Sequence, residues 1–241
     1  MVQRRVVRRP HSPRLYAECY LYRYLRHLFD TSTHWQSYDP FFQTKSDTFL
    51  ASEAGIHACA KLIQELLEKN ATHAVHDPAT NVIIDELVSS SLWGNATDLS
   101  LLTNLNYADL QKLQATSAEH RKEKQQFVLV NQLADAWDAM RSMDHGRVDI
   151  VLDNAGFELY CDCVYADWLI QAGIASEVHF HGKRLPWFVS DVTRKDWSWL
   201  LNTMTYGHLF EGATDKEIES LRTLGKRWKQ YEKEGKWVYE Q

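Results

Sequence analysis

The chain has 241 residues, 44% of them hydrophobic and 12% aromatic, with a formal net charge of −5. This composition excludes a disordered or low-complexity protein, because enough apolar surface is present to form the core of one large or two small domains. The slight excess of acidic residues argues against nucleic acid as a partner.

The N-terminus lacks the apolar segment of a signal peptide, and no apolar run is long enough to span a bilayer. We therefore expect no membrane association and a cytoplasmic location, with the nucleus as an additional compartment. Reduced thiols are expected there at the four cysteines, Cys19, Cys59, Cys161 and Cys163.

The first half of the chain predicts helices. Apolar residues recur at helical spacing over residues 13–30, Asp47–Lys69, Ala79–Leu92 and Tyr107–Glu119. Asp39 and Pro40 interrupt this pattern and predict a loop over Thr31–Lys45. Residues 1–122 are therefore predicted to form a helical N-terminal part.

Strand-like and helix-like segments alternate in the second half. The predicted strands are Gln126–Asn131, Val148–Leu152, Val178–His181 and Trp187–Val189. The predicted helices are Leu133–Met143, Phe157–Ala172, Asp196–Thr205 and Asp215–Glu234. Strands separated by helices favour a parallel sheet. The predicted fold class is α/β (α+β overall), with the helical part packed on a Rossmann-like layer of largely parallel strands over residues 123–241.

Two of the predicted strands lead into aspartates, Asp153 and Asp191. Ligands of open parallel sheets bind beyond the carboxyl ends of the strands. Two carboxylates and the amide oxygen of Asn154 would suit a hard cation such as Mg²⁺ or Mn²⁺, and such a site would serve phosphoester hydrolysis. The spacing equally fits helix caps, and it does not separate the two interpretations.

Other polar residues carry weaker signals. Glu158, five residues after Asp153, is either a general base or substrate contact, or only a partner of the helix dipole. His179 and His181 would share one face of a strand, where surface or packed histidines are expected rather than zinc ligands. Lys183 and Arg184 would contact an anion or form a solvated loop. The run Arg222–Lys226 is interpreted as a solvated helix face.

Three ordered motifs resemble the metal-dependent damage-control phosphatases, and among them the eukaryotic sugar-phosphate phosphatases also described as protein-glutamate (acidic residue) methyltransferases. The motifs lie at Asp153–Glu158, Val178–Lys183 and Pro186–Thr193. Segments Ala17–Arg23 and Leu92–Ser100 also resemble that group. The resemblance runs from about residue 13 to the end of the chain.

The resemblance implies that Asp153, Asn154 and Asp191 bind Mn²⁺, or Co²⁺, Ni²⁺ or Mg²⁺. It implies catalytic roles for Asp153 and Asp191, and substrate contacts from Asp153, Asn154 and Glu158. The implied substrates are small sugar phosphates, fructose 1-phosphate among them. For the methyltransferase activity, Glu158 and Asp191 would contact S-adenosylmethionine. Protein partners are not indicated.

The chain departs from the family after Tyr239, where relatives continue into segments that contact the substrate phosphate. The sequence is therefore expected to be truncated at its C-terminus. Three hypotheses follow: a sugar-phosphate phosphatase, an S-adenosylmethionine-dependent methyltransferase of protein glutamates, and an inactive remnant that keeps the fold.

Overall fold

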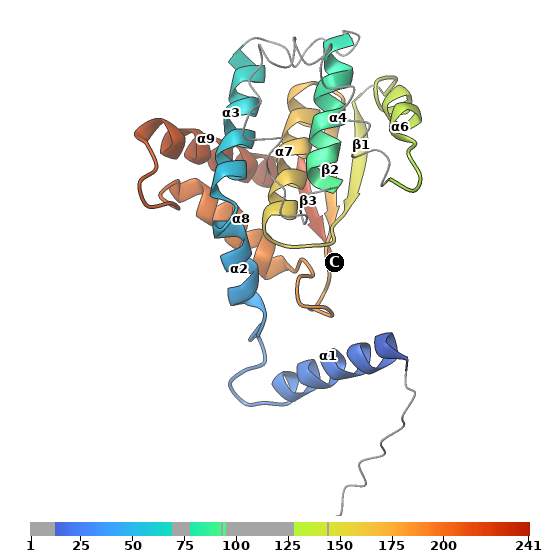
Figure 1. The fold of residues 1–241 in the computed structure, drawn as a ribbon, viewed down its shortest axis with the longest axis vertical. Helices are drawn as coiled ribbons and strands as arrows, with labels where there is room; N and C mark the ends of the chain where they lie inside the picture. Colours follow the sequence, from blue (N-terminus) through green and yellow to red (C-terminus); the bar gives the residue numbers. More distant parts are fainter. Residues whose placement is uncertain (1–12, 69–77, 93, 95–127, 144) are drawn as a thin grey trace, which may run out of the picture.

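A computed structural model describes residues 13–68, 78–92, 94, 128–143 and 145–241. The helices of these ranges are α1 (Arg14–Asp30), α2 (Phe42–Leu50), α3 (Glu53–Glu68), α4 (Pro78–Leu92), α6 (Leu133–Met140), α7 (Phe157–Gln171), α8 (Arg194–Tyr206) and α9 (Asp215–Glu234). The strands are β1 (Gly146–Val151), β2 (Ala175–His181) and β3 (Trp237–Glu240). Figure 1 shows α1 at one end of the molecule, away from the layer formed by α3, α4 and α7.

The three strands form one parallel sheet in the order β1-β2-β3. Val148 pairs with Val178, and Val178 pairs with Trp237. Helix α7 connects β1 to β2, and α8 and α9 connect β2 to β3. Parallel strands need such helical crossovers, so the α/β expectation is confirmed. All three carboxyl ends lie at one edge of the sheet.

Helix α7 is the central helix of the fold. It contacts β2 on one side and α3 and α4 on the other (Figure 1). Its sequence is apolar around most of its circumference, and Leu159, Cys163 and Trp168 are all buried. A helix that is apolar on all sides is one that is surrounded by other elements. The start of α7 therefore has little freedom to move relative to the sheet.

Aromatic rings fill the space between the sheet and the two C-terminal helices. Phe180 of β2 lies 4.6 Å from Trp197 of α8, measured between ring centroids. Trp237 of β3 lies 5.5 Å from Trp228 of α9. These four side chains are almost completely buried, and such ring pairs stabilise a core beyond the area that they bury.

Two predicted strands are wrong, and one strand was missed. Residues Val128–Asn131 of the first are irregular, and Gln126 and Phe127 lie outside the described residues. Trp187–Val189 forms a bend and turn rather than a strand. Strand β3 follows the left-handed Gly235 that ends α9.

The helices differ from the prediction mainly in the N-terminal part. Residues Phe42–Lys45, predicted as a loop, begin α2, and the predicted helix Asp47–Lys69 is two helices, α2 and α3. The predicted helix Tyr107–Glu119 and the proposed boundary at residues 122 and 123 lie outside the described residues.

The run Arg222–Lys226 is only partly a solvated helix face. A Cβ atom on Gly225 would lie 2.4 Å from the backbone of Met204 and Thr205, so α9 crosses α8 at this glycine. Thr223 and Lys226 are exposed, as expected. The cysteines among the described residues are free thiols, and Cys161 and Cys163 are buried in the core. No described helix is long and apolar enough to cross a membrane.

Candidate functional site

The segment between β1 and α7 pairs with the turn that contains Asp191. Asn154 and Asp191 form an isolated antiparallel bridge. The backbone N–H of Ala155 donates to the carbonyl of Ser190 over 2.7 Å, and that of Val192 donates to the carbonyl of Asp153 over 3.1 Å. The structure therefore brings Asp153, Asn154 and Asp191 together, although they are separated by up to 38 positions.

The carboxylate of Asp191 is buried and holds its own turn in place. Its Oδ2 atom accepts the backbone N–H groups of Trp187, over 3.0 Å, and Phe188, over 2.9 Å. No residue in the described ranges donates a hydrogen bond to Oδ1. Oδ2 therefore fixes the conformation of the turn, while Oδ1 is the oxygen available to a cation.

Asn154 is held from two sides. Ser190 Oγ donates to Asn154 Oδ1 over 2.5 Å. Asn154 Nδ2 donates to Glu158 Oε2 and to Asp153 Oδ2, each over 3.0 Å. The backbone N–H of Asn154 also donates to Glu158 Oε1 over 3.3 Å. Glu158 therefore orients Asn154, and this contact is more specific than a helix-dipole interaction.

The interpretation of these residues as helix caps is wrong. The N-cap of α7 is Gly156, and no side chain caps that helix. The N-cap of α8 is Thr193, which forms a capping box with Asp196. Asp153, Asn154 and Asp191 thus have no capping function that would explain their positions. Asp191 also follows a turn, whereas a strand was predicted before it.

The acidic side chains at the start of α7 have raised pKa values. Partial burial raises the pKa of Glu158, and the hydrogen bonds from Asn154 oppose that effect. One turn further into the core, burial raises the pKa of Asp162 to about 7, although the hydroxyl of Ser91 donates a hydrogen bond to it. Raised carboxyl pKa values are typical of groups that exchange protons near neutral pH.

A buried lysine supports the turn from the side of α2. Lys45 Nζ donates to the backbone carbonyl of Asp191 over 2.9 Å and to Asp196 Oδ2 over 2.7 Å. It also lies 3.0 Å from Asp39 Oδ2. Lys45 is not predictable from a local sequence pattern, because its partners Asp191 and Asp196 are 146 and 151 positions away.

Two glycines allow close approach of backbone segments at the site. Gly156 has a φ of 86°, a conformation that side chains disfavour. A Cβ atom on Gly94, just after α4, would lie 2.7 Å from the Cα atom of Glu158. Gly94 belongs to the segment Leu92–Ser100 that carries part of the family resemblance. That motif was the available signal that the end of α4 lies beside the site.

The donor atoms of the candidate site fit a hard cation. The ranges that the structure describes contain no cluster of three His, Cys, Asp or Glu side chains that could hold a metal ion. A site built from Asp153, Asn154 and Asp191 instead combines two carboxylates with one amide oxygen. Mg²⁺ and Mn²⁺ accept such a set, since they bind few protein oxygens and keep several waters.

The histidines lie elsewhere, on a charged face of the sheet. His179 Nδ1 lies 2.6 Å from Glu240 Oε1, and His181 Nε2 lies 2.6 Å from Asp149 Oδ1. Both rings therefore pair with carboxylates of neighbouring strands, which agrees with the expectation that they are surface or packed histidines of the sheet. The Asp149 carboxylate has a lowered pKa, because Arg147 and His181 hydrogen-bond to it.

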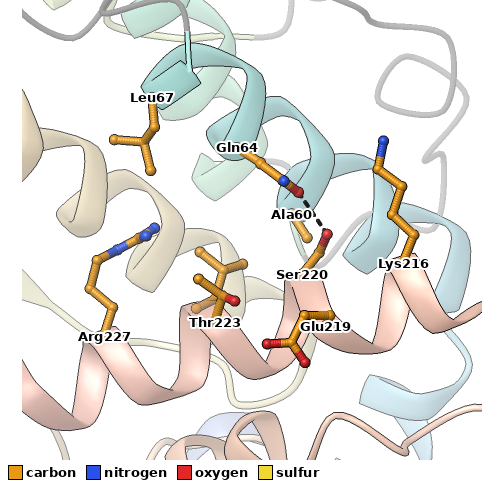
Figure 2. A pocket seen from close by; sticks show the side chains of 9 residues that line it. Ala60, Gln64, Leu67, Lys216, Glu219, Ser220, Thr223 and Arg227 are labelled. Atoms are coloured by element: carbon orange, nitrogen blue, oxygen red, sulfur yellow. Dashed lines mark hydrogen bonds between the residues drawn. The ribbon is translucent and has the colours of Figure 1, made fainter.

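A separate pocket lies between α3 and α9, away from these residues. Figure 2 shows Gln64 of α3 facing Ser220 of α9, and the hydroxyl donates to the amide oxygen over 2.7 Å. Arg227 lines the same pocket and pairs with the completely buried Asp167. None of the predicted site residues lines this pocket.

An α/β layer with polar side chains gathered at the carboxyl end of a parallel strand is an arrangement typical of proteins that bind small polar ligands. The chain belongs to the damage-control phosphatase ARMT1-like domain family, whose profile matches residues 2–241. The resemblance seen in the sequence is thereby confirmed.

Curated relatives agree with this assignment. The chain is 35% identical over 237 residues to the damage-control phosphatase ARMT1 of Danio rerio, covering 95% of this chain and 49% of that protein. It is 36% identical to the protein of the same name from Rattus norvegicus and 32% identical to that from Homo sapiens, covering 95% of this chain and 50% of each relative. The chain thus spans about half the length of the curated relatives it matches.

Proposed function

We propose that this chain is the metal-binding part of a phosphatase that hydrolyses phosphorylated metabolites in damage control, with sugar phosphates such as fructose 1-phosphate as substrates. The family and the names of its relatives support a phosphatase. The observation that carries the assignment to a site is the bridge between Asn154 and Asp191, which brings both beside Asp153.

Asp153, Asn154 and Asp191 would hold the cation, Mn²⁺ in the first instance, with Co²⁺, Ni²⁺ and Mg²⁺ as alternatives. When bound there, such an ion polarises a phosphoryl group and lowers the pKa of a coordinated water. Asp153 is exposed, and its Oδ2 atom accepts a hydrogen bond from Asn154 Nδ2 over 3.0 Å. Asp191 is fixed by the two N–H groups that it accepts, and Asn154 is fixed by Ser190 and Glu158.

Glu158 is the group that we assign to proton transfer. Its carboxylate accepts a hydrogen bond from Asn154, the residue that follows Asp153 and pairs with Asp191 in the β-bridge. Because burial raises its pKa, it holds a proton more readily than an exposed glutamate does. It can therefore take a proton from water or give one to a leaving alkoxide with a smaller free-energy barrier.

The test is phosphate release from fructose 1-phosphate by the 241-residue protein with Mn²⁺, compared with the same reaction in EDTA. Asp153→Ala and Asp191→Asn should each lower turnover by about 100-fold or more, since even residues that only orient metal ligands contribute 10- to 100-fold. Asp138→Asn is the matched control, because Asp138 is an exposed aspartate of α6 whose partner is Arg141. It should leave turnover unchanged.

Full activity of Asp191→Asn would refute this site. Binding of Mn²⁺ without turnover would mean that the ligands are correct and that substrate contacts must come from elsewhere. Calorimetry with S-adenosylmethionine, with and without Mn²⁺, separates the methyltransferase hypothesis, which requires cofactor binding that the phosphatase does not.

A further inference from the structure

A second cavity, of about 620 Å³, lies beyond the carboxyl ends of β2 and β3. Its walls come from α1 and the loop that follows it, from the segment that follows β2, from the start of α8 and from Gln241. Asp153, Asn154, Glu158 and Asp191 do not line it. It is therefore a separate feature of the molecule from the candidate metal site.

Basic side chains outnumber acidic side chains in the lining of the cavity. Its basic side chains are Arg23, Arg26, Arg184, Arg194 and Lys195, and its acidic side chains are Asp30 and Asp39. Both acids already have cationic partners. Asp30 lies 2.8 Å from Arg26, and Asp39 lies 3.0 Å from Lys45, which is not part of the lining. Asp30 also lies 3.8 Å from Arg23, so Arg23 and Arg26 share Asp30, and neither acid pairs with the other three basic side chains.

Two of the basic side chains have no anionic partner in the described ranges. Arg184 is exposed and forms no hydrogen bond or ion pair with a described residue. Lys195 Nζ lies 4.2 Å from the centroid of the Phe42 ring, and no carboxylate within the described ranges pairs with it. Arg194, in contrast, is occupied, because it donates to Glu232 and to the carbonyl of Tyr239.

We propose that this cavity binds a phosphate group, and that Arg184 and Lys195 are the side chains that make the main contacts with it. Arginine presents planar donors that match phosphate oxygens in pairs, and lysine adds a compact positive charge. The phosphate belongs either to free inorganic phosphate or to a phosphorylated small molecule. This proposal does not depend on metal binding or on turnover at the candidate metal site.

The test is a ³¹P NMR titration of inorganic phosphate with the 241-residue protein in EDTA. Saturable broadening of the phosphate signal is expected. Arg184→Gln and Lys195→Gln should each weaken the affinity about tenfold, the effect of losing one charge-assisted contact. Lys183→Gln is the matched control, since Lys183 is an exposed neighbour of Arg184 that does not line the cavity.

A second titration, with fructose 1-phosphate in EDTA, identifies the source of the phosphate group. Tighter binding than inorganic phosphate, lost in the same two variants, identifies a phosphate ester as the ligand. Equal or weaker binding with the same sensitivity identifies free phosphate. Both results support the site.

Three results would overturn the proposal. The first is the absence of saturable binding. The second is equal weakening by Lys183→Gln and Arg184→Gln, which would indicate a general effect of surface charge. The third is binding that requires Mn²⁺ or disappears in Asp153→Ala, which would place the phosphate at the candidate metal site. A protein without turnover can still pass this test, so the two proposals fail independently.

Discussion

Replacing Lys45 with methionine tests whether the buried cation holds the candidate site together. The side chain is 3% exposed and lies between Asp39 and Asp196, which are themselves buried. Methionine has a similar volume and no charge, so the change removes the ammonium group without leaving a large cavity. The two carboxylates and the carbonyl of Asp191 would then lose their shared partner.

The expected loss is large for a single substitution. Removing one partner of a buried ion pair typically lowers the free energy of unfolding by about 3–5 kcal/mol, because the other charge stays buried without compensation. Two carboxylates are left here, so we expect a value in this range or above it. An exposed ion pair contributes only about 0–1 kcal/mol. Lys61→Met is therefore the control, since the Lys61 side chain is 62% exposed and lies 3.9 Å from Glu65.

Urea denaturation followed by circular dichroism measures both variants against the unmodified protein. If Lys45→Met is too unstable to purify, the double variant Lys45→Met/Asp196→Asn removes one of the stranded charges. It should therefore fold, and where both single variants can also be measured, its loss of stability should be smaller than the sum of their losses by about 1 kcal/mol or more, as expected for residues in direct contact. A loss of less than about 1 kcal/mol in Lys45→Met, equal to that of Lys61→Met, would refute the reasoning.

Two further predictions concern stability. Burial raises the pKa of Asp162 from its ordinary value of 3.8 to about 7 in the folded protein. Between these two pH values the folded state binds a proton that the unfolded state has released, so the free energy of unfolding falls as the pH rises. Asp162→Asn should remove that dependence, which amounts to at most about 1.4 kcal/mol per pH unit, and unfolding curves at several pH values will show whether the slope persists. Gly225→Ala should lower the free energy of unfolding by about 1–3 kcal/mol despite the higher helix propensity of alanine, because its Cβ would lie 2.4 Å from the backbone of Met204. Thr223→Ala, at an exposed position of the same helix, should be neutral or stabilising, and an equal loss in both variants would argue against the close helix crossing.

The elements predicted correctly from the sequence are those whose local pattern and tertiary environment agree. Helix α9 combines an apolar stripe with a capping box at Thr214 and a glycine after its last turn. The sequence of strand β2 alternates between apolar and polar residues from Val178 to His181, and its apolar residues Val178 and Phe180 are completely buried. Strand β3 has only four residues after a charged helix, and its Trp and Tyr become core residues only through contacts with α8 and α9. Such long-range packing is not visible in a local window.

The run Trp187–Val189 is short and apolar, and such a run predicts a buried strand on periodicity alone. It folds instead as a turn because the N–H groups of Trp187 and Phe188 point at the carboxylate of Asp191. Asp191 thus has a folding role and a proposed metal-binding role, and the choice of substitution separates them. Asparagine keeps an oxygen that can accept both N–H groups but removes the charge, so Asp191→Asn should fold normally and lose cation affinity. Alanine removes both, so Asp191→Ala should also loosen the turn and lower stability. Equal unfolding curves for the two variants would mean that the turn does not depend on this side chain.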